Sequence, residues 1–171
     1  AGEVATMVRA AGEGTAARMV ELRAVQAGFP FYGRIELEGG VEYTHDLLRG
    51  NGVLVRPELL AQLRIAQGDS ILIGGKPFEI RGVLLKEPGR RAAAFSLGPR
   101  VYMDHADLAE TGLLTFGSRP RYEILLKVQD SGVDVLTRQL REDLRDSFVG
   151  AWSYRQAETD ISEDMARAEN Y

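Results

Sequence analysis

Residues 52–88 read GVLVRPELLAQLRIAQGDSILIGGKPFEIRGVLLKEP, and every local pattern in this stretch agrees with its neighbours. A short apolar run is followed by a proline where a helix tolerates the missing N–H, and leucines then recur at helical spacing. Two more apolar runs follow, joined by Gly74-Gly75, a pair that can adopt the positive φ angles of a tight turn. The stretch therefore predicts a β-α-β-β unit with a sharp hairpin.

The last strand of this unit is predicted to alternate between a packed and a solvated face, because successive side chains of a strand point to opposite sides. The expected packed face holds Phe78, Ile80, Gly82 and Leu84, and the expected solvated face holds Glu79, Arg81 and Val83. No residue type or spacing in the unit is typical of a catalytic site.

The composition limits what the chain can be. Its 171 residues are enough to bury about 70% of the unfolded surface, which suits one domain or two small subdomains. The net charge of −4, from 21 basic and 25 acidic residues, disfavours nucleic acid and anionic membrane as partners. No cysteine is present, which excludes disulfides and thiolate zinc sites, and no apolar run approaches the roughly 18 residues of a membrane span. We expect a soluble fragment of a longer protein.

The rest of the chain predicts further strands and helices. At the start, residues 3–9 and 15–25 alternate between apolar and polar and should form a hairpin. Asp104 and Asp107 are typical of a helix N-cap and its first-turn acid. The elements expected after the central unit are a strand over 100–103, a short helix ended by Gly112, a strand over 121–128, a helix from Ser131, a strand over 151–156 and a helix from Asp160.

The closing order β-α-β-α predicts a small α/β sandwich completed by the N-terminal hairpin. We therefore predict an α+β fold with two subdomains. Residues 1–32 and 118–171 form the α/β subdomain, and residues 33–117 form an inserted mixed, strand-rich subdomain.

Two groups of residues are candidates for contacts with the other subdomain, a ligand or a partner protein. Phe29, Phe31 and Tyr32 cluster around a proline at a chain reversal, where they either seal the junction between the subdomains or stack on a ligand. Arg90 and Arg91 lie in a run without periodicity, expected to be a mobile loop, where they are either a solvated tip or a partner contact.

No other residues in the sequence indicate a catalytic, metal or phosphate-binding site. His45 and His105 each have an acid close by, but a metal site needs three or four converging ligands and no such spacing is present. Ser96 does not lie in a G-x-S-x-G elbow, and Gly74-Gly75-Lys76 lacks the earlier glycine and the hydroxyl residue of a phosphate loop. We predict no enzyme, no metal and no cofactor.

The order of short motifs points to a known family. Residues 53–88 carry VLV-P-LL-L-GD-I-IGG-F-I-GV---EP, preceded by VELRAV at 20–25 and FPFYG at 29–33 and followed by FSLGPRV at 95–101. In this order the chain resembles the extracytoplasmic domain of MacB/FtsX-type ABC transporter permeases, in particular the large permeases that carry two such loops. The family usually has one more strand and helix ahead of the residues that match Glu3–Arg9.

The resemblance implies a non-catalytic periplasmic domain at the bacterial inner membrane. Such a domain couples ATP hydrolysis by a separate cytoplasmic ATPase subunit to export, extraction or mechanical signalling, with a periplasmic partner or cargo that the resemblance does not identify. It also implies two subdomains arranged as predicted above. The residues alone leave open a stand-alone soluble binding protein, or a hydrolase whose site is not legible in sequence.

Overall fold

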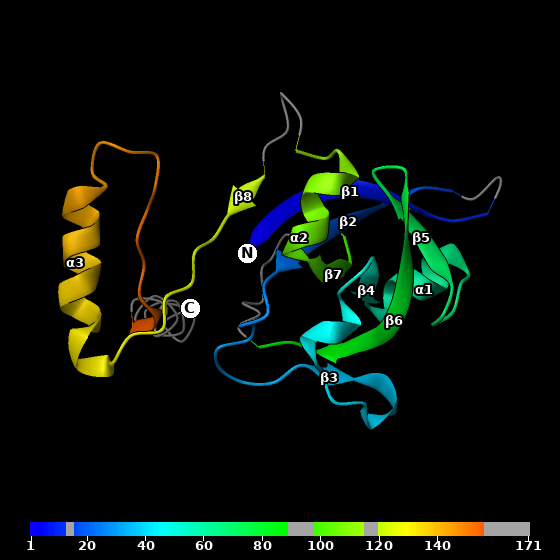
Figure 1. Cartoon of the computed structure of the whole chain (residues 1–171), viewed down its shortest axis with the longest axis horizontal. Helices are drawn as coiled ribbons and strands as arrows, with labels where there is room; N and C mark the ends of the chain where they lie inside the picture. Colours follow the sequence, from blue (N-terminus) through cyan, green and yellow to red (C-terminus); the bar gives the residue numbers. More distant parts are fainter. Residues whose placement is uncertain (13–15, 89–97, 115–119, 156–171) are drawn as a thin grey trace, which may run out of the picture. The chain divides into compact units, whose positions relative to one another are not determined.

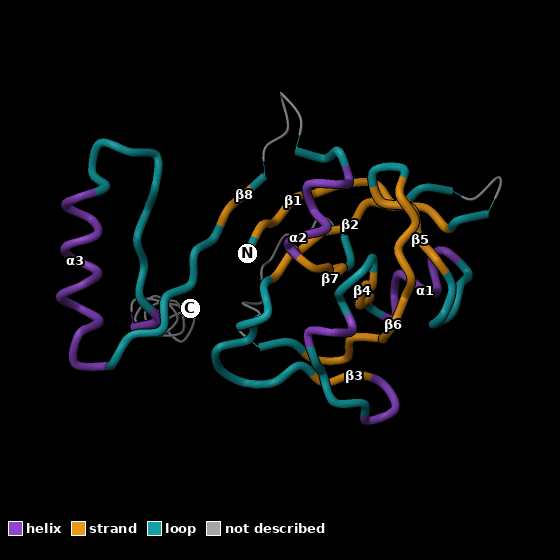
Figure 2. Tube along the Cα trace, in the orientation of Figure 1, coloured by secondary structure: helices purple, strands orange, loops and turns teal. Residues whose placement is uncertain are grey.

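The computed structural model describes residues 1–12, 16–88, 98–114 and 120–155, and the chain divides into two compact units, 1–125 and 126–171. Helices and strands are both present, and one strand-rich sheet dominates the first unit, as the α+β prediction requires (Figure 1, Figure 2). The strands among the described residues are β1 (Gly2–Ala10), β2 (Arg18–Val25), β3 (Glu36–Leu37), β4 (Gly52–Val55), β5 (Ser70–Ile73), β6 (Lys76–Lys86), β7 (Arg100–Asp104) and β8 (Arg121–Tyr122).

The sheet of the first unit closes on itself. β1 pairs with β2 along one edge and with β5 along the other, so the order β1-β2-β7-β4-β6-β5 returns to β1 as a barrel. The pairs β2–β7 and β4–β6 are parallel, and the other pairs of the ring are antiparallel. β8 pairs with the first residues of β1, and β3 pairs with the end of β6. Closure leaves few unpaired strand edges.

Two short helices contribute leucines to the barrel interior. α1 (Pro57–Leu63) begins with proline at its first turn and buries Leu59 and Leu63. α2 (His105–Leu108) is capped by Asp104, whose side chain accepts a hydrogen bond from the backbone N–H of Ala106 at 3.0 Å, as predicted. Three-residue 3₁₀ turns lie at Glu38–Gly40, His45–Leu47 and Ala109–Thr111.

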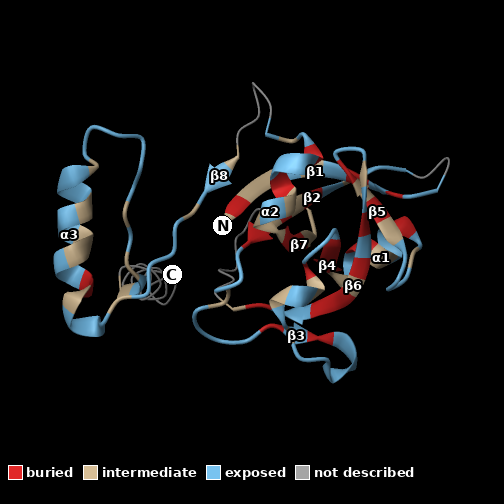
Figure 3. Ribbon diagram, viewed as in Figure 1, coloured by how far each residue is buried: buried red, intermediate tan, exposed pale blue. Residues whose placement is uncertain are grey.

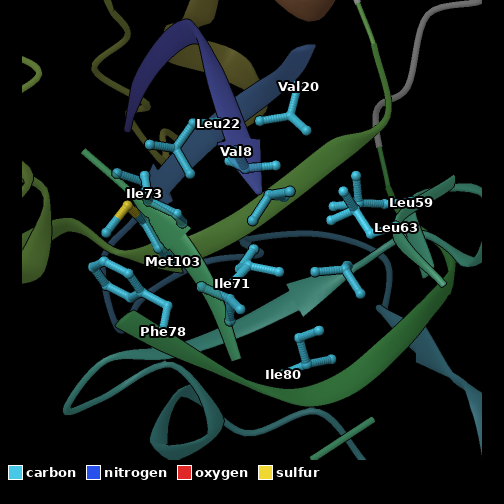
Figure 4. Close-up of a cluster of buried hydrophobic side chains, with 14 of the residues drawn as sticks. Val8, Val20, Leu22, Leu59, Leu63, Ile71, Ile73, Phe78, Ile80 and Met103 are labelled. Atoms are coloured by element: carbon cyan, nitrogen blue, oxygen red, sulfur yellow. The ribbon is translucent and has the colours of Figure 1, made fainter. Parts of the chain in front are cut away.

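Buried residues lie along the strands of the barrel and on its helices (Figure 3). Side chains from the strands and from the two helices fill the barrel as its inner core (Figure 4). Alternation along each strand selects these residues, because every second side chain points inward. The buried members of this inner cluster are Val8, Val20, Leu22, Ala24, Val53, Val55, Leu59, Leu63, Ile71, Ile73, Phe78, Ile80, Val101, Met103 and Leu108.

A second cluster covers the outer face of the barrel. It forms where the chain between β2 and β4 folds back over the outward side chains of β4, β6 and β7. Its buried members are Val25, Ile35, Leu37, Leu48, Leu54, Leu84 and Tyr102. The barrel wall near β7 is therefore packed on both sides.

The predicted β-α-β-β unit is confirmed as β4, α1, β5 and β6, with a turn at Gly74-Gly75 in which both φ angles are positive. β6 also carries a bulge that the sequence pattern did not predict. Val53 of β4 pairs with Ile80, but the next residue of β4 pairs with Gly82, so Arg81 is an extra residue in β6.

The bulge makes the predicted faces of β6 wrong beyond Ile80. Phe78 and Ile80 point into the inner cluster, whereas Leu84 belongs to the outer cluster. Val83, expected on the solvated face, is 2% exposed. One inserted residue reverses the alternation, because the side-chain period of a strand is two.

The N-terminal hairpin is confirmed as β1 and β2, but it is part of the barrel. β1 is hydrogen-bonded to β5 and β2 to β7, and both partners come from the predicted insertion 33–117. The chain also divides into two compact units at residue 125. Pairing between distant strands leaves no local sequence signal, so the pattern could not locate it. The assembly of residues 1–32 with 118–171 into one α/β subdomain stays a prediction.

The second unit contains α3 (Val133–Asp143), preceded by a 3₁₀ turn at Asp130–Gly132. The predicted amphipathic helix is confirmed, with Val133 buried and Leu136 and Leu140 half-buried. The regular helix begins two residues after the predicted start, because residues 130–132 take up the tighter turn.

Two predicted strands in this part of the chain are wrong in extent or type. The strand over 121–128 is limited to β8, and residues 151–153 have no regular structure, while Tyr154 and Arg155 are helical. Arg155 donates a hydrogen bond to Asp134 at 2.6 Å, so side-chain bonds to the start of α3 replace a strand ladder there. The predicted helix from Asp160 lies outside the described residues.

Candidate functional site

The aromatic residues predicted as a site lie at the turn after β2. The ring of Phe29 stacks on that of Tyr102 with 5.8 Å between centroids and 27° between planes, and so joins the outer cluster. Phe31 and Tyr32 are 39% and 67% exposed. The three side chains therefore differ in environment: Phe29 packs into the barrel wall, and the other two reach its surface. Their role at a junction stays a prediction.

A pocket of about 410 Å³ opens beside this turn. Phe29 and Phe31 line one side, and Tyr122, Ile124 and Leu125, from β8 and the residues after it, line another. Ile124 is 85% exposed although it is apolar. The pocket is thus a mainly apolar hollow at the place where the chain leaves the first unit. The sequence pattern did not connect these two segments.

Arg23 of β2 contacts residues around the point where the chain leaves the first unit. Its guanidinium carbon lies 5.2 Å from the centroid of the Phe29 ring, within the range of a cation–π contact. Its Nη2 donates to Glu123 Oε2 at 3.3 Å, and its Nε lies 3.4 Å from Glu3 Oε1, an ion pair that is not aligned as a hydrogen bond. The backbone N–H of Glu123 also donates to the carbonyl of Ala1 at 2.9 Å. The exit segment, residues 121–125, is therefore fixed to β1 and β2.

A buried acid lies on the other side of Tyr102. The Glu87 side chain is 1% exposed; one of its oxygens accepts hydrogen bonds from the Tyr102 hydroxyl and, at 3.1 Å, from Arg100. Arg56 lies 4.0 Å from the other oxygen. Burial and the hydrogen bond to Glu87 raise the pKa of Tyr102 above its ordinary value. This polar cluster joins the ends of β6 and β7, on either side of residues 89–97.

The predicted contact residues Arg90 and Arg91 lie outside the described residues. Glu87 and Arg100, which flank them, were not predicted as site residues. Glu87 lies in the sequence Lys-Glu-Pro, a composition typical of a solvent-exposed strand end. The local sequence therefore gives no indication that Glu87 is buried.

The acid that contacts His45 comes from a distant part of the sequence. His45 Nε2 lies 3.1 Å from Asp104 Oδ2, whereas its sequence neighbour Asp46 pairs with Arg49. Burial and the nearby Asp104 carboxylate raise the pKa of the Tyr43 hydroxyl to about 12. Among the described residues no group of three or more His, Cys, Asp or Glu side chains could hold a metal ion. The contact between His45 and Asp104, together with the hydrogen bond from the Asn51 N–H to Asp107 at 3.1 Å, fixes the 43–51 segment to the start of α2.

No helix within the described ranges has the length and apolar character needed to cross a membrane.

Comparisons with known proteins identify the family. The family model described as "MacB-like periplasmic core domain" matches residues 1–146. The chain is 26% identical over 133 residues to the ABC transporter permease YbbP of Escherichia coli strain K12; the match covers 77% of this chain but 16% of that permease.

One solved transporter domain supports the fold. The extracellular domain of the noncanonic ABC-type transporter YknZ from Gram-positive bacteria matches with a TM-score of 0.51 at 14% identity, covering 82% of this chain and 73% of that one. The periplasmic region of MacB from Actinobacillus actinomycetemcomitans matches with a TM-score of 0.48 at 16% identity, covering 83% and 66%. The resemblance noted in the motif order is confirmed by the family model, and the chain belongs to the family of MacB-like periplasmic core domains.

Proposed function

We propose that this chain is the extracytoplasmic domain of an ABC transporter permease. It lies on the periplasmic side of a bacterial inner membrane. There it couples ATP hydrolysis by a cytoplasmic subunit to export, extraction or mechanical signalling in the periplasm. The observation that carries the proposal is the family match over residues 1–146, supported by the similarity to a permease. The domain takes part as a transmitting body and performs no chemical step of its own.

Transmission requires that a displacement of one part of the domain moves the rest. The closed barrel supports this requirement, because each strand of the ring is hydrogen-bonded to a neighbour on both sides, so a displacement of one strand acts on the next. The exit segment supports it as well, because side-chain and backbone bonds fix residues 121–125 to the barrel before the chain enters the second unit. Phe29 and Phe31 line the pocket at this exit, and with Tyr32 they are the proposed junction residues.

The test uses the full-length permease with its ATPase in lipid nanodiscs. Spin labels at Gln62→Cys, exposed on α1 in the predicted insertion, and Arg138→Cys, exposed on α3 in the predicted α/β subdomain, report the distance across the predicted junction. We expect trapping with ATP and vanadate to shift this distance.

Replacing Phe29, Phe31 and Tyr32 by alanine should reduce the shift to less than about half, because the junction loses packing that large aromatic side chains supply. The matched control is Glu110→Ala, which removes only a surface ion pair with Lys76 and should leave the shift unchanged. An unchanged distance in the unaltered protein contradicts transmission. A normal shift in the triple variant contradicts the junction role alone.

A further inference from the structure

Residues from four neighbouring strands form one line across the outer face of the barrel. Arg23 of β2 is paired in register with Glu3 of β1 on one side and with Tyr102 of β7 on the other. Glu3 is in turn paired with Arg121 of β8. Because residues paired across adjacent strands point to the same face, these side chains lie side by side.

Phe29 covers the middle of this line. Its ring stacks on Tyr102 and lies under the guanidinium of Arg23. The Tyr102 ring is fully buried, and its hydroxyl is held by Glu87, which Arg100 also binds. Arg23 therefore makes polar contacts at one end of this line and Glu87 makes them at the other, with the Phe29–Tyr102 stack between them.

We propose that Arg23 is the positioning residue of the exit segment and that Glu87, which does not touch Arg23, sets how firmly Arg23 holds it. Glu87 fixes the Tyr102 ring through its hydroxyl, and that ring fixes Phe29. Phe29 in turn supports the guanidinium that binds Glu123. The polar cluster at the ends of β6 and β7 is thereby coupled to the segment through which the chain leaves the first unit.

The coupling has a plain physical basis. A guanidinium beside an aromatic ring gains a cation–π attraction whose strength depends on the position of the ring. A buried tyrosine that loses its hydrogen bond gains freedom to shift, and interior side chains are packed closely enough to pass such a shift to a neighbour. Only the use of this coupling in transport rests on the proposed function; the coupling itself is a property of the 171-residue chain.

Amide hydrogen exchange measured by NMR on the 171-residue chain tests the proposal. The reporter is the amide of Glu123, which donates to the Ala1 carbonyl. Tyr102→Phe removes the hydroxyl and keeps the ring, and should speed exchange at Glu123 by about fivefold, a local loss of roughly 1 kcal/mol. Arg23→Met should speed it at least as much. Adding Tyr102→Phe to Arg23→Met should produce no further increase, because both changes act on one chain of contacts.

Glu21→Gln is the matched control. Glu21 accepts a hydrogen bond from Arg100 at 3.4 Å, as Glu87 does at 3.1 Å, but the Tyr102 hydroxyl is bound by Glu87. This variant should leave Glu123 exchange within about twofold of the unaltered chain, since surface and rim pairs contribute little. The amide of Ile80, which donates to the carbonyl of Asp69, reports on unfolding of the barrel as a whole. Glu123 should exchange faster than Ile80 in the unaltered chain and in every variant, because Glu123 opens locally.

Three results would overturn the proposal. In the first, Glu123 exchange is unchanged in Tyr102→Phe. In the second, the two substitutions act additively, which means that Arg23 and Tyr102 contribute separately. In the third, the Glu123 amide has the same opening free energy as the Ile80 amide, which means that Glu123 exchanges only when the whole barrel unfolds. None of these results depends on spin-label distances in the full transporter, so the coupling and the proposed function fail separately.

Discussion

The turn between β5 and β6 offers a comparison between two adjacent glycines. Gly74 and Gly75 have φ angles of +58° and +86°, so alanine at either position is strained by about 1–2 kcal/mol. A Cβ at Gly75 would meet open space, but one at Gly74 would lie 1.8 Å from the carbonyl oxygen of Thr111. Thr111 cannot easily move, because it is 2% exposed and its hydroxyl donates to the carbonyl of Leu108 at 2.7 Å.

Overpacking adds about 1–3 kcal/mol to the strain, so Gly74→Ala should cost roughly 2–5 kcal/mol and Gly75→Ala about 1–2 kcal/mol. Urea unfolding followed by far-UV circular dichroism measures both free energies. Fluorescence is unsuitable, because the one tryptophan, Trp152, belongs to the second unit. Equal losses in the two variants would refute the packing of the turn against the end of the α2 region.

Two further changes test the outer and inner clusters. Burial and Asp104 raise the pKa of Tyr43 from 10.0 to about 12, so its contribution to stability is complete below pH 10 and is lost as the pH rises toward 12. The unfolding free energy should fall there by up to about 1.4 kcal/mol per pH unit; Tyr43→Phe should lessen this slope in urea unfolding, and an unchanged slope would contradict the assignment. Leu59→Ala empties a fully buried position of α1 and should cost about 2–5 kcal/mol in the same assay. Leu60→Ala, at a half-buried neighbour, should cost less, and equal costs would show that α1 does not pack into the barrel as described.

Local patterns predicted the elements well where a single segment decides its own structure. The proline before α1, the glycine pair at 74–75 and the Asp104 cap each act on residues within a few positions. The barrel could not be predicted in this way, because its closure depends on β1 meeting β5 across about sixty residues of chain. The family resemblance was legible for another reason: it rests on the order of many short motifs.

In the candidate site, too, the sequence revealed residues with a conspicuous local pattern and missed those whose role depends on distant partners. Phe29, Phe31 and Tyr32 were found because an aromatic group around a proline is conspicuous in sequence. Arg23 and Glu87 were missed, since each lies in a segment with the ordinary polar–apolar alternation of a strand or strand end. Their roles come from partners 100 and 15 residues away, Glu123 and Tyr102, which only the folded chain brings near. The bulge at Arg81 had no local signal either.

The side of the membrane on which this domain lies is the most direct test of the account. These 171 residues contain no cysteine, so Met7→Cys, at a position 50% exposed on β1, supplies one labelling site once cysteines elsewhere in the full-length permease are replaced. A membrane-impermeant maleimide should label it in intact spheroplasts as completely as after lysis, because the proposed orientation exposes the domain to the periplasm. Labelling only after lysis would contradict the assignment to the extracytoplasmic side and, with it, the proposed transmission across the membrane.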